Sequence, residues 1–218
     1  MPAKNTVKSY LENGVYHIYN RGVDKRIIFT DQQDYKVFLS YFKLYLTPPI
    51  DPYTTSYVRP EYLPKNYHKD IDLVAYCLMP NHFHLLVQQR SKLAIASFMQ
   101  SLGTKYSIYF NKRHQRSGAL FQSRYKAALV DKDAYLVHLS RYIHLNPKSI
   151  NQNLISSYSS YADYLGLRQT TWIKPQLVLS NFTQYAQTPL VKHQTYKGFI
   201  EDHEVESAKI LGKLTLEE

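Results

Sequence analysis

The sequence contains a single cysteine, Cys77, among 218 residues. One thiol cannot form an internal disulfide framework or a cysteine-based zinc cluster, so both are excluded. The chain also lacks any apolar run of about 18 residues, the length that a membrane-spanning helix needs. Its first ten residues lack the apolar core of a signal peptide. We therefore expect a cytoplasmic protein with no membrane partner.

Acidic residues are missing from a long central part of the chain. None occurs between Asp72 and Asp131, and the whole sequence has 27 Lys and Arg against 17 Asp and Glu, a formal net charge of +10. Because lysine and arginine release counterions when they lie near phosphates, this segment favours a polyanionic partner. A solvated basic face is the alternative interpretation. The basic residues of the segment are Arg90, Lys92, Lys105, Lys112, Arg113, Arg116, Arg124 and Lys126.

The spacing of apolar residues predicts the order of the secondary structure. Apolar residues make up 44% of the chain, which excludes an intrinsically disordered protein. We expect strands at 16–20, 71–78, 83–89 and 120–130, and helices at 32–46, 91–113 and from 131 to the Asn146-Pro147 stop. This order is the βαββαβ outline of an α+β fold, a ferredoxin-like or RRM-like sandwich with a central antiparallel sheet.

The same spacing suggests how the chain is divided. Residues 1–150 are expected to form the βαββαβ domain, and the proline-rich residues 47–69 an insertion or loop within it. Beyond residue 150 the apolar pattern weakens into short helical stretches. Residues 151–218 are therefore expected to form a helical C-terminal extension.

Two histidines flank one apolar residue at the start of the third expected strand. Alternate residues of a strand face the same side, so His82 and His84 present two imidazoles side by side, while Phe83 faces the other way. Two neutral imidazoles can hold one divalent cation and leave positions open for a substrate oxygen. Two half-exposed histidines beside a turn are the simpler interpretation of a bare His-apolar-His pattern. Lone histidines such as His17 are interpreted as packing residues.

Four segments of the chain together resemble a known family. Residues 79–86, Met-Pro-Asn-His-Phe-His-Leu-Leu, have the form of the HUH motif. The other three segments are 16–22, Tyr-His-Ile-Tyr-Asn-Arg-Gly; 118–126, Gly-Ala-Leu-Phe-Gln-Ser-Arg-Tyr-Lys; and 141–147, Arg-Tyr-Ile-His-Leu-Asn-Pro. With these four segments in their order along the chain, the sequence resembles the single-tyrosine HUH transposases (IS200-like). Among these it resembles the REP-associated tyrosine transposases most.

The resemblance implies a metal-dependent enzyme that cleaves and rejoins single-stranded DNA at hairpin sequences through a covalent 5′-phosphotyrosine. The nucleophile would be a tyrosine on the helix after the HUH strand, where Tyr106 matches best and Tyr109 is the alternative. Tyr106 also continues the apolar stripe of that helix, so a core role stays open. The metal should be Mg²⁺ or Mn²⁺, since a hard, labile ion lets the phosphate come and go. Relatives act as monomers or as homodimers.

The third metal ligand departs from the family pattern. Relatives usually supply a polar side chain four residues after the nucleophile, and for Tyr106 that position is Phe110, which cannot bind a metal. Asn111 is the nearest amide and is the expected ligand. Gln88, on the histidine face of the strand, is the alternative.

Contacts to DNA phosphates are expected along the basic segment and after the first strand. Such contacts position a nucleic acid without reading its sequence. Two other functions stay open, namely a non-catalytic single-stranded nucleic-acid-binding protein that retains the fold and a metal-dependent hydrolase that uses water. The expected DNA-binding residues are Arg21, Lys25, Arg26, Lys105, Lys112, Arg113, Arg116, Arg124 and Lys126.

Overall fold

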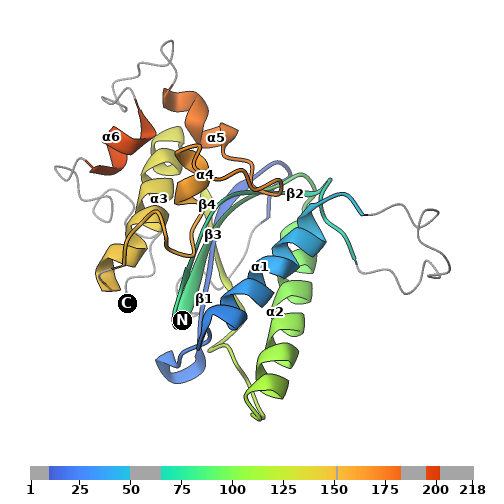
Figure 1. The fold of residues 1–218 in the computed structure, drawn as a ribbon. Coiled ribbons are helices and arrows are strands. Elements are labelled where there is room, and N and C mark those ends of the chain that lie inside the picture. The colour runs from blue at the N-terminus through green and yellow to red at the C-terminus, as the bar shows by residue number, and fades with distance from the viewer. Residues whose placement is uncertain (1–9, 50–64, 151, 183–194, 202–218) are drawn as a thin grey trace, which may run out of the picture.

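The computed structural model describes residues 10–49, 65–150, 152–182 and 195–201 (Figure 1). Most of the expected insertion at 47–69 therefore lies outside the described residues. The main elements are β1 (Val15–Arg21), α1 (Gln32–Leu46), β2 (Ile71–Met79), β3 (His82–Gln89), α2 (Ala94–Arg113), β4 (Lys126–Val130) and α3 (Asp133–Leu145). Shorter helices are η1 (Val23–Lys25), η3 (Asn146–Ile150), α4 (Tyr161–Tyr164), α5 (Gln176–Leu179), η4 (Ser180–Phe182) and α6 (Tyr196–Glu201).

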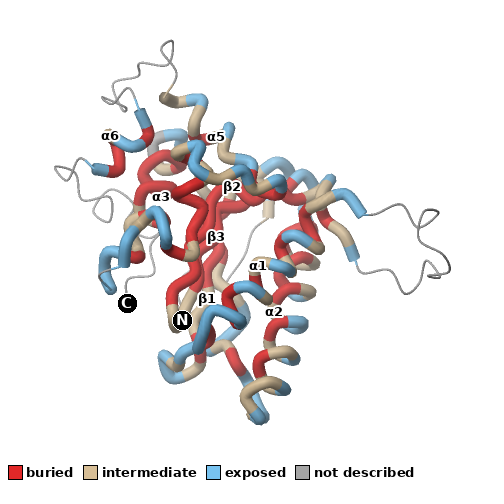
Figure 2. The backbone as a smooth tube through the Cα atoms, viewed as in Figure 1, coloured by how far each residue is buried: buried red, intermediate tan, exposed pale blue. Residues whose placement is uncertain are grey.

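The four strands form one sheet in the order β2-β3-β1-β4, and every neighbouring pair is antiparallel. This arrangement confirms the expected α+β sandwich. Helices α1 and α2 cover one face of the sheet, and α3 with the later helices covers the other (Figure 1). The strands between these layers are largely buried (Figure 2).

Alternation along β3 divides its side chains between the two faces. Phe83, Leu85 and Val87 join the core beneath α1 and α2, whereas Leu86 joins the core beneath α3. His82 and His84 share the face of Leu86 because they lie two and four residues before it. The histidines therefore face α3.

Helices α1 and α2 form as their sequences predict. Asp31 caps α1 by accepting hydrogen bonds from the backbone N–H groups of Gln33 and Asp34. Helix α2 buries a stripe at helical spacing that includes Ile95, Phe98, Met99, Leu102, Tyr106 and Phe110. This apolar stripe packs against the apolar face of the sheet.

The fourth strand is shorter than expected. It begins at Lys126, and the residues before it form a loop that is hydrogen-bonded to the end of β1. The N–H of Gln122 donates to the carbonyl of Arg21 at 2.9 Å, and the N–H of Val23 donates to the carbonyl of Leu120 at 3.0 Å. Gly118, whose φ is +85°, turns the chain into this loop.

The short helices after α3 pack on the α3 side of the sheet. Val178, Tyr196 and Phe199 lie in one core cluster with residues of α3. The buried His144 of α3 ties them together, since its two ring nitrogens bond the hydroxyls of Tyr196 and Ser160, each at 2.7 Å. No helix in the described part of the chain is long and apolar enough to cross a membrane.

Candidate active site

The two histidines of β3 follow a tight turn that the neighbouring segments hold in place. The N–H of Gly22 donates to the carbonyl of Asn81 at 2.9 Å, and the N–H of Ile28 donates to the carbonyl of Pro80 at 2.8 Å. The rings of His82 and His84 are 5.0 Å apart between centroids and nearly perpendicular, at 88°. His82 is partly exposed at the turn, while His84 is fully buried. The expected pair is thus formed, with one ring at the surface and one beneath it.

Each ring has its Nδ1 atom occupied by a neighbour. Nδ1 of His82 lies 2.6 Å from Oδ1 of Asn81, whose Nδ2 donates to the carbonyl of Lys25. Nδ1 of His84 lies 2.9 Å from Nε2 of His17. Because Oδ1 of Asn81 only accepts, the proton of His82 lies on Nδ1 and its lone pair on Nε2. The other ring nitrogen of His84, the buried Nε2, has no hydrogen-bond partner among the described residues.

Helix α3 brings a tyrosine and an amide to the same place. The ring of Tyr142 lies edge-on to His84, 5.4 Å between centroids, and 6.2 Å from His17. Asn146 ends α3, donates through Nδ2 to the carbonyl of Tyr142 at 2.8 Å, and has a side-chain hydrogen bond with His82. Tyr142 is half-buried. A phenol, an amide and two imidazoles therefore meet on the α3 side of the sheet.

Burial keeps both imidazoles neutral. It lowers the pKa of His82 to about 4, the positive charge of Arg21 adds to this shift, and the hydrogen bond with Asn146 opposes it. Burial also lowers the pKa of His84 well below its usual range, and the adjacent rings of His17 and His82 contribute. Neutral imidazole is the form that binds a metal ion.

This donor set fits a divalent cation. A cation could take the lone pair of the unpartnered Nε2 of His84, together with His82 and the amide oxygen of Asn146. No group of three His, Cys, Asp or Glu side chains in the described ranges could hold a metal. Asn146 is the amide in contact with the pair and is the candidate for a third protein ligand.

Comparison with known proteins finds one family similar to part of the chain. The model of the family described as "Transposase IS200 like" matches residues 61–146, a range that contains β2, β3, α2, β4 and α3. Over residues 61–146 the chain is similar to the IS200-like transposases. This match confirms the resemblance that the sequence motifs indicated.

A solved structure has the same fold as this chain. It is described as the structure of the REP associates tyrosine transposase bound to a REP hairpin. The two chains are 12% identical, with a TM-score of 0.52, and the match covers 77% of this chain and 95% of the other. No curated protein matches the chain.

Tyr106, the expected nucleophile, lies on the opposite side of the sheet from the histidine pair. Tyr106 is fully buried among Phe29 and Phe38, and its hydroxyl donates to the carbonyl of Ile28. It belongs to the core beneath α1 and α2, which Phe83 also faces. The sheet therefore separates Tyr106 from the histidines. The geometry corrects the expectation that Tyr106 lies beside the pair.

Tyr109 is no better placed. It lies on the same helix, and its hydroxyl donates to Oδ1 of the buried Asp34 at 3.0 Å. Burial, together with that hydrogen bond and the charge of Asp34, raises the pKa of Tyr109 to about 12. Neither tyrosine of α2 contacts the histidine pair.

The two amides expected as third ligands also lie elsewhere. Asn111 donates through Nδ2 to the carbonyl of Gly118 at 2.9 Å and accepts from Arg116 at 3.1 Å, so it holds the loop after α2. Gln88 is four residues beyond His84 on the same face, roughly 13 Å along an extended strand. Neither of these positions contacts the histidine pair in the structure, whereas Asn146 does. The sequence carries the family's spacing of a tyrosine and a polar residue four positions later in the Arg-Tyr-Ile-His-Leu-Asn-Pro segment, where Asn146 follows Tyr142 by four residues.

Some of the expected DNA-binding residues lie close to the histidines. Arg21 pairs with His82 across the sheet, and Nζ of Lys126 lies 5.9 Å from the ring of Tyr19 on the histidine face. Lys25 and Arg26 follow in the turn after β1, where Nε of Arg26 donates to the carbonyl of Val23. These four cations surround the turn and strand ends at the site.

The other expected DNA-binding residues lie along α2 and the loop after it. Arg113 is bound in ion pairs of 2.6 Å with both Asp31 and Asp34, which assigns it a structural role. Lys105 lies over the ring of Tyr41 at 5.5 Å, and Arg116 over that of Phe110 at 5.9 Å. Lys112 and Arg124 are exposed.

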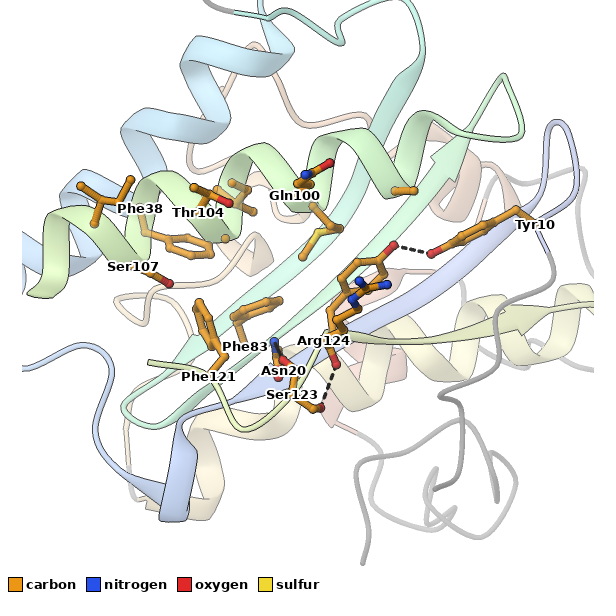
Figure 3. A pocket seen from close by; sticks show the side chains of 16 residues that line it. Tyr10, Asn20, Phe38, Phe83, Gln100, Thr104, Ser107, Phe121, Ser123 and Arg124 are labelled. Atoms are coloured by element: carbon orange, nitrogen blue, oxygen red, sulfur yellow. Dashed lines mark hydrogen bonds between the residues drawn. The ribbon is translucent and has the colours of Figure 1, made fainter. Parts of the chain in front are cut away.

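A separate cavity of about 760 Å³ lies between α2 and the loop before β4 (Figure 3). Phe83 and Phe121 form part of its apolar wall, and Asn20, Ser123 and Arg124 supply polar groups. Because Phe83 faces α2, the cavity and the histidine pair lie on opposite faces of the sheet.

Proposed function

We propose that the protein is a metal-dependent transposase that cleaves and rejoins single-stranded DNA at hairpin sequences, with Tyr142 as its nucleophile. The observation that carries this proposal is the meeting of Tyr142 and Asn146 with His82 and His84 on one face of the sheet. All four side chains come from a single chain. The proposed site therefore needs no residue from a second copy.

His82, His84 and Asn146 would hold Mg²⁺ or Mn²⁺. Bound there, the cation would polarise the scissile phosphate and offset its negative charge. The surrounding residues prepare this set, because Asn81 and His17 occupy the Nδ1 atoms and leave the Nε2 atoms to face the cation. Burial keeps both rings neutral, so no proton competes for their lone pairs near pH 7.

Tyr142 would carry out the covalent step. Its phenolic oxygen loses a proton to water and attacks the phosphorus of the scissile phosphodiester, forming an O–P bond. The bond from phosphorus to the 3′ oxygen breaks, and that oxygen takes up a proton to leave as a 3′-hydroxyl. The 5′ phosphate stays on the tyrosine. Since one phosphoester replaces another, a 3′-hydroxyl can reverse the step and rejoin the strand without ATP.

DNA is the partner that the surroundings of the site favour. Arg21, Lys25, Arg26 and Lys126 place positive charge around the strand ends, where a phosphate backbone could lie. The solved structure with the same fold belongs to a transposase bound to a REP hairpin, which supports a hairpin as the substrate. The absence of a polar ligand at Phe110 would favour the non-catalytic alternative, but Asn146 would supply such a ligand from α3.

The proposal is tested by assaying a labelled single-stranded hairpin, taken from DNA that flanks the gene, on a denaturing gel with Mn²⁺. Wild type should form an adduct that survives denaturation, and Tyr142→Phe and His84→Ala should form none. Tyr106→Phe is the matched control, since it also removes a phenolic hydroxyl but on the other face of the sheet.

Each alternative has its own outcome in this assay. Cleavage without an adduct would indicate a hydrolase that uses water. Tight hairpin binding with neither cleavage nor adduct would indicate a binding protein. An adduct that Tyr142→Phe retains and Tyr106→Phe loses would overturn the assignment of the nucleophile.

A further inference from the structure

His17 stacks on His84 in the interior of the protein. Both rings are fully buried, and they stack at 5.1 Å between centroids with 19° between their planes. Nε2 of His17 lies 2.9 Å from Nδ1 of His84. The two residues are not paired across the sheet, because His17 is opposite Leu86 and His84 is opposite Tyr19. The contact therefore links two strands diagonally beneath the proposed site.

A hydrogen bond between two neutral imidazoles needs one donor and one acceptor. If Nε2 of His17 donates, His84 carries its own proton on Nε2 and cannot bind a metal there. If Nδ1 of His84 donates, the lone pair of His84 lies on Nε2. These two arrangements have the same heavy-atom geometry, and only the second is compatible with a metal on His84.

The surroundings of Nε2 favour the second arrangement once a cation is bound. Nε2 of His84 is buried and has no hydrogen-bond partner among the described residues. A proton there would be a buried donor without an acceptor, which is unfavourable. A lone pair there is equally without a partner until a cation takes it.

We propose that His17 is a positioning residue that accepts the proton of His84 Nδ1 and thereby holds His84 in the tautomer that binds a divalent cation. This inference rests on the metal site of the proposed function. His17 does not touch the cation or the DNA in this assignment, and it acts only through His84. Its ring is itself held by Tyr19, at 4.9 Å between centroids, and by Tyr142, at 6.2 Å.

The first measurement is the tautomer of His84 in the protein with a divalent cation bound. Long-range ¹H–¹⁵N correlation spectra of protein labelled at histidine distinguish a protonated from an unprotonated Nε2, and a His84→Gln variant assigns the signals. The decisive spectrum is that of the protein saturated with Mg²⁺, a diamagnetic ion. We expect wild-type His84 to have its proton on Nδ1. A wild-type proton on Nε2 would overturn the proposal.

The second measurement is the affinity for Mn²⁺. Binding is monitored through the electron paramagnetic resonance signal of the free ion. His17→Leu should weaken binding by about 10- to 100-fold, the usual effect of removing such a partner. His17→Gln should restore most of the affinity, because the amide oxygen can accept the same proton. His138→Leu is the control, since it deletes another buried imidazole, one that packs on Phe199.

The outcomes separate this inference from the metal site itself. If His17→Leu binds Mn²⁺ as wild type does while His84→Ala does not, the metal site stands and the role of His17 is wrong. If His84→Ala also binds as wild type does, the metal site is absent and the inference falls with it. Equal losses in His17→Leu, His17→Gln and His138→Leu would mark a general packing effect and would overturn the positioning role.

Discussion

His82 should make the metal-free protein less stable in acid. An unfolded chain holds this histidine at its ordinary pKa of 6.5, whereas burial in the native protein lowers the pKa to about 4. Between these two values the unfolded chain binds a proton that the native protein does not. The free energy of unfolding therefore falls as the pH falls from about 6.5 to 4. The stabilising contribution of the neutral His82 is fully present above pH 6.5.

The size of the effect follows from the shift. Each unit of pKa difference corresponds to about 1.4 kcal/mol, so His82 alone accounts for a loss of about 3 kcal/mol at the acid end. His84 and His144 also have lowered pKa values and add to the loss in the wild type. A His82→Gln variant isolates the contribution of one ring, because glutamine keeps a polar side chain but does not titrate.

Urea unfolding in EDTA measures this contribution. Wild type and His82→Gln are compared at about pH 7 and about pH 4.5, and the loss on acidification should be smaller in the variant by about 2–3 kcal/mol. EDTA is needed because a bound cation would itself compete with protons. Equal losses in the two proteins would show that His82 is not buried in its neutral form.

Three further outcomes are expected. Tyr106→Phe leaves the carbonyl of Ile28 without its donor, so it should lower the free energy of unfolding in urea by about 1–3 kcal/mol and leave adduct formation unchanged; loss of the adduct would contradict the site. Asn146→Ala should weaken Mn²⁺ binding by at least about tenfold, and unchanged binding would exclude Asn146 as a ligand. Gly22→Ala puts a Cβ atom 2.3 Å from the carbonyl oxygen of Arg26, so thermal unfolding should show a loss of about 1–3 kcal/mol, whereas an unchanged midpoint would contradict this close approach.

The fold could be predicted because its elements have strong local patterns. The alternation of Phe83, Leu85 and Val87 identifies a strand with one apolar face, and Asp31 marks the start of α1 through its capping hydrogen bonds. The fourth strand was expected to be longer than it is. Its first residues instead bond to the end of β1, a tertiary contact that no local pattern reports.

Tyr106 could be expected beside the histidines because sequence order does not say which face of a sheet a helix covers. The first helix after the HUH strand is α2, and its apolar stripe matches the apolar face of β3, opposite His82 and His84. Helix α3 covers the histidine face. Tyr106 belongs to that apolar stripe, so its burial was foreseeable from spacing alone. The contact between His17 and His84 could not be predicted from spacing, because it depends on the register between β1 and β3.

Mass spectrometry of the wild-type adduct tests whether Tyr142 is the nucleophile without any substitution. After the DNA is trimmed by nuclease and the protein is digested with trypsin, Tyr142 lies in the peptide 142–148, and Tyr106 and Tyr109 both lie in the peptide 106–112. We predict that the nucleotide is attached through a phosphotyrosine in the peptide 142–148. A nucleotide attached to the peptide 106–112 would contradict the site proposed on the α3 side of the sheet.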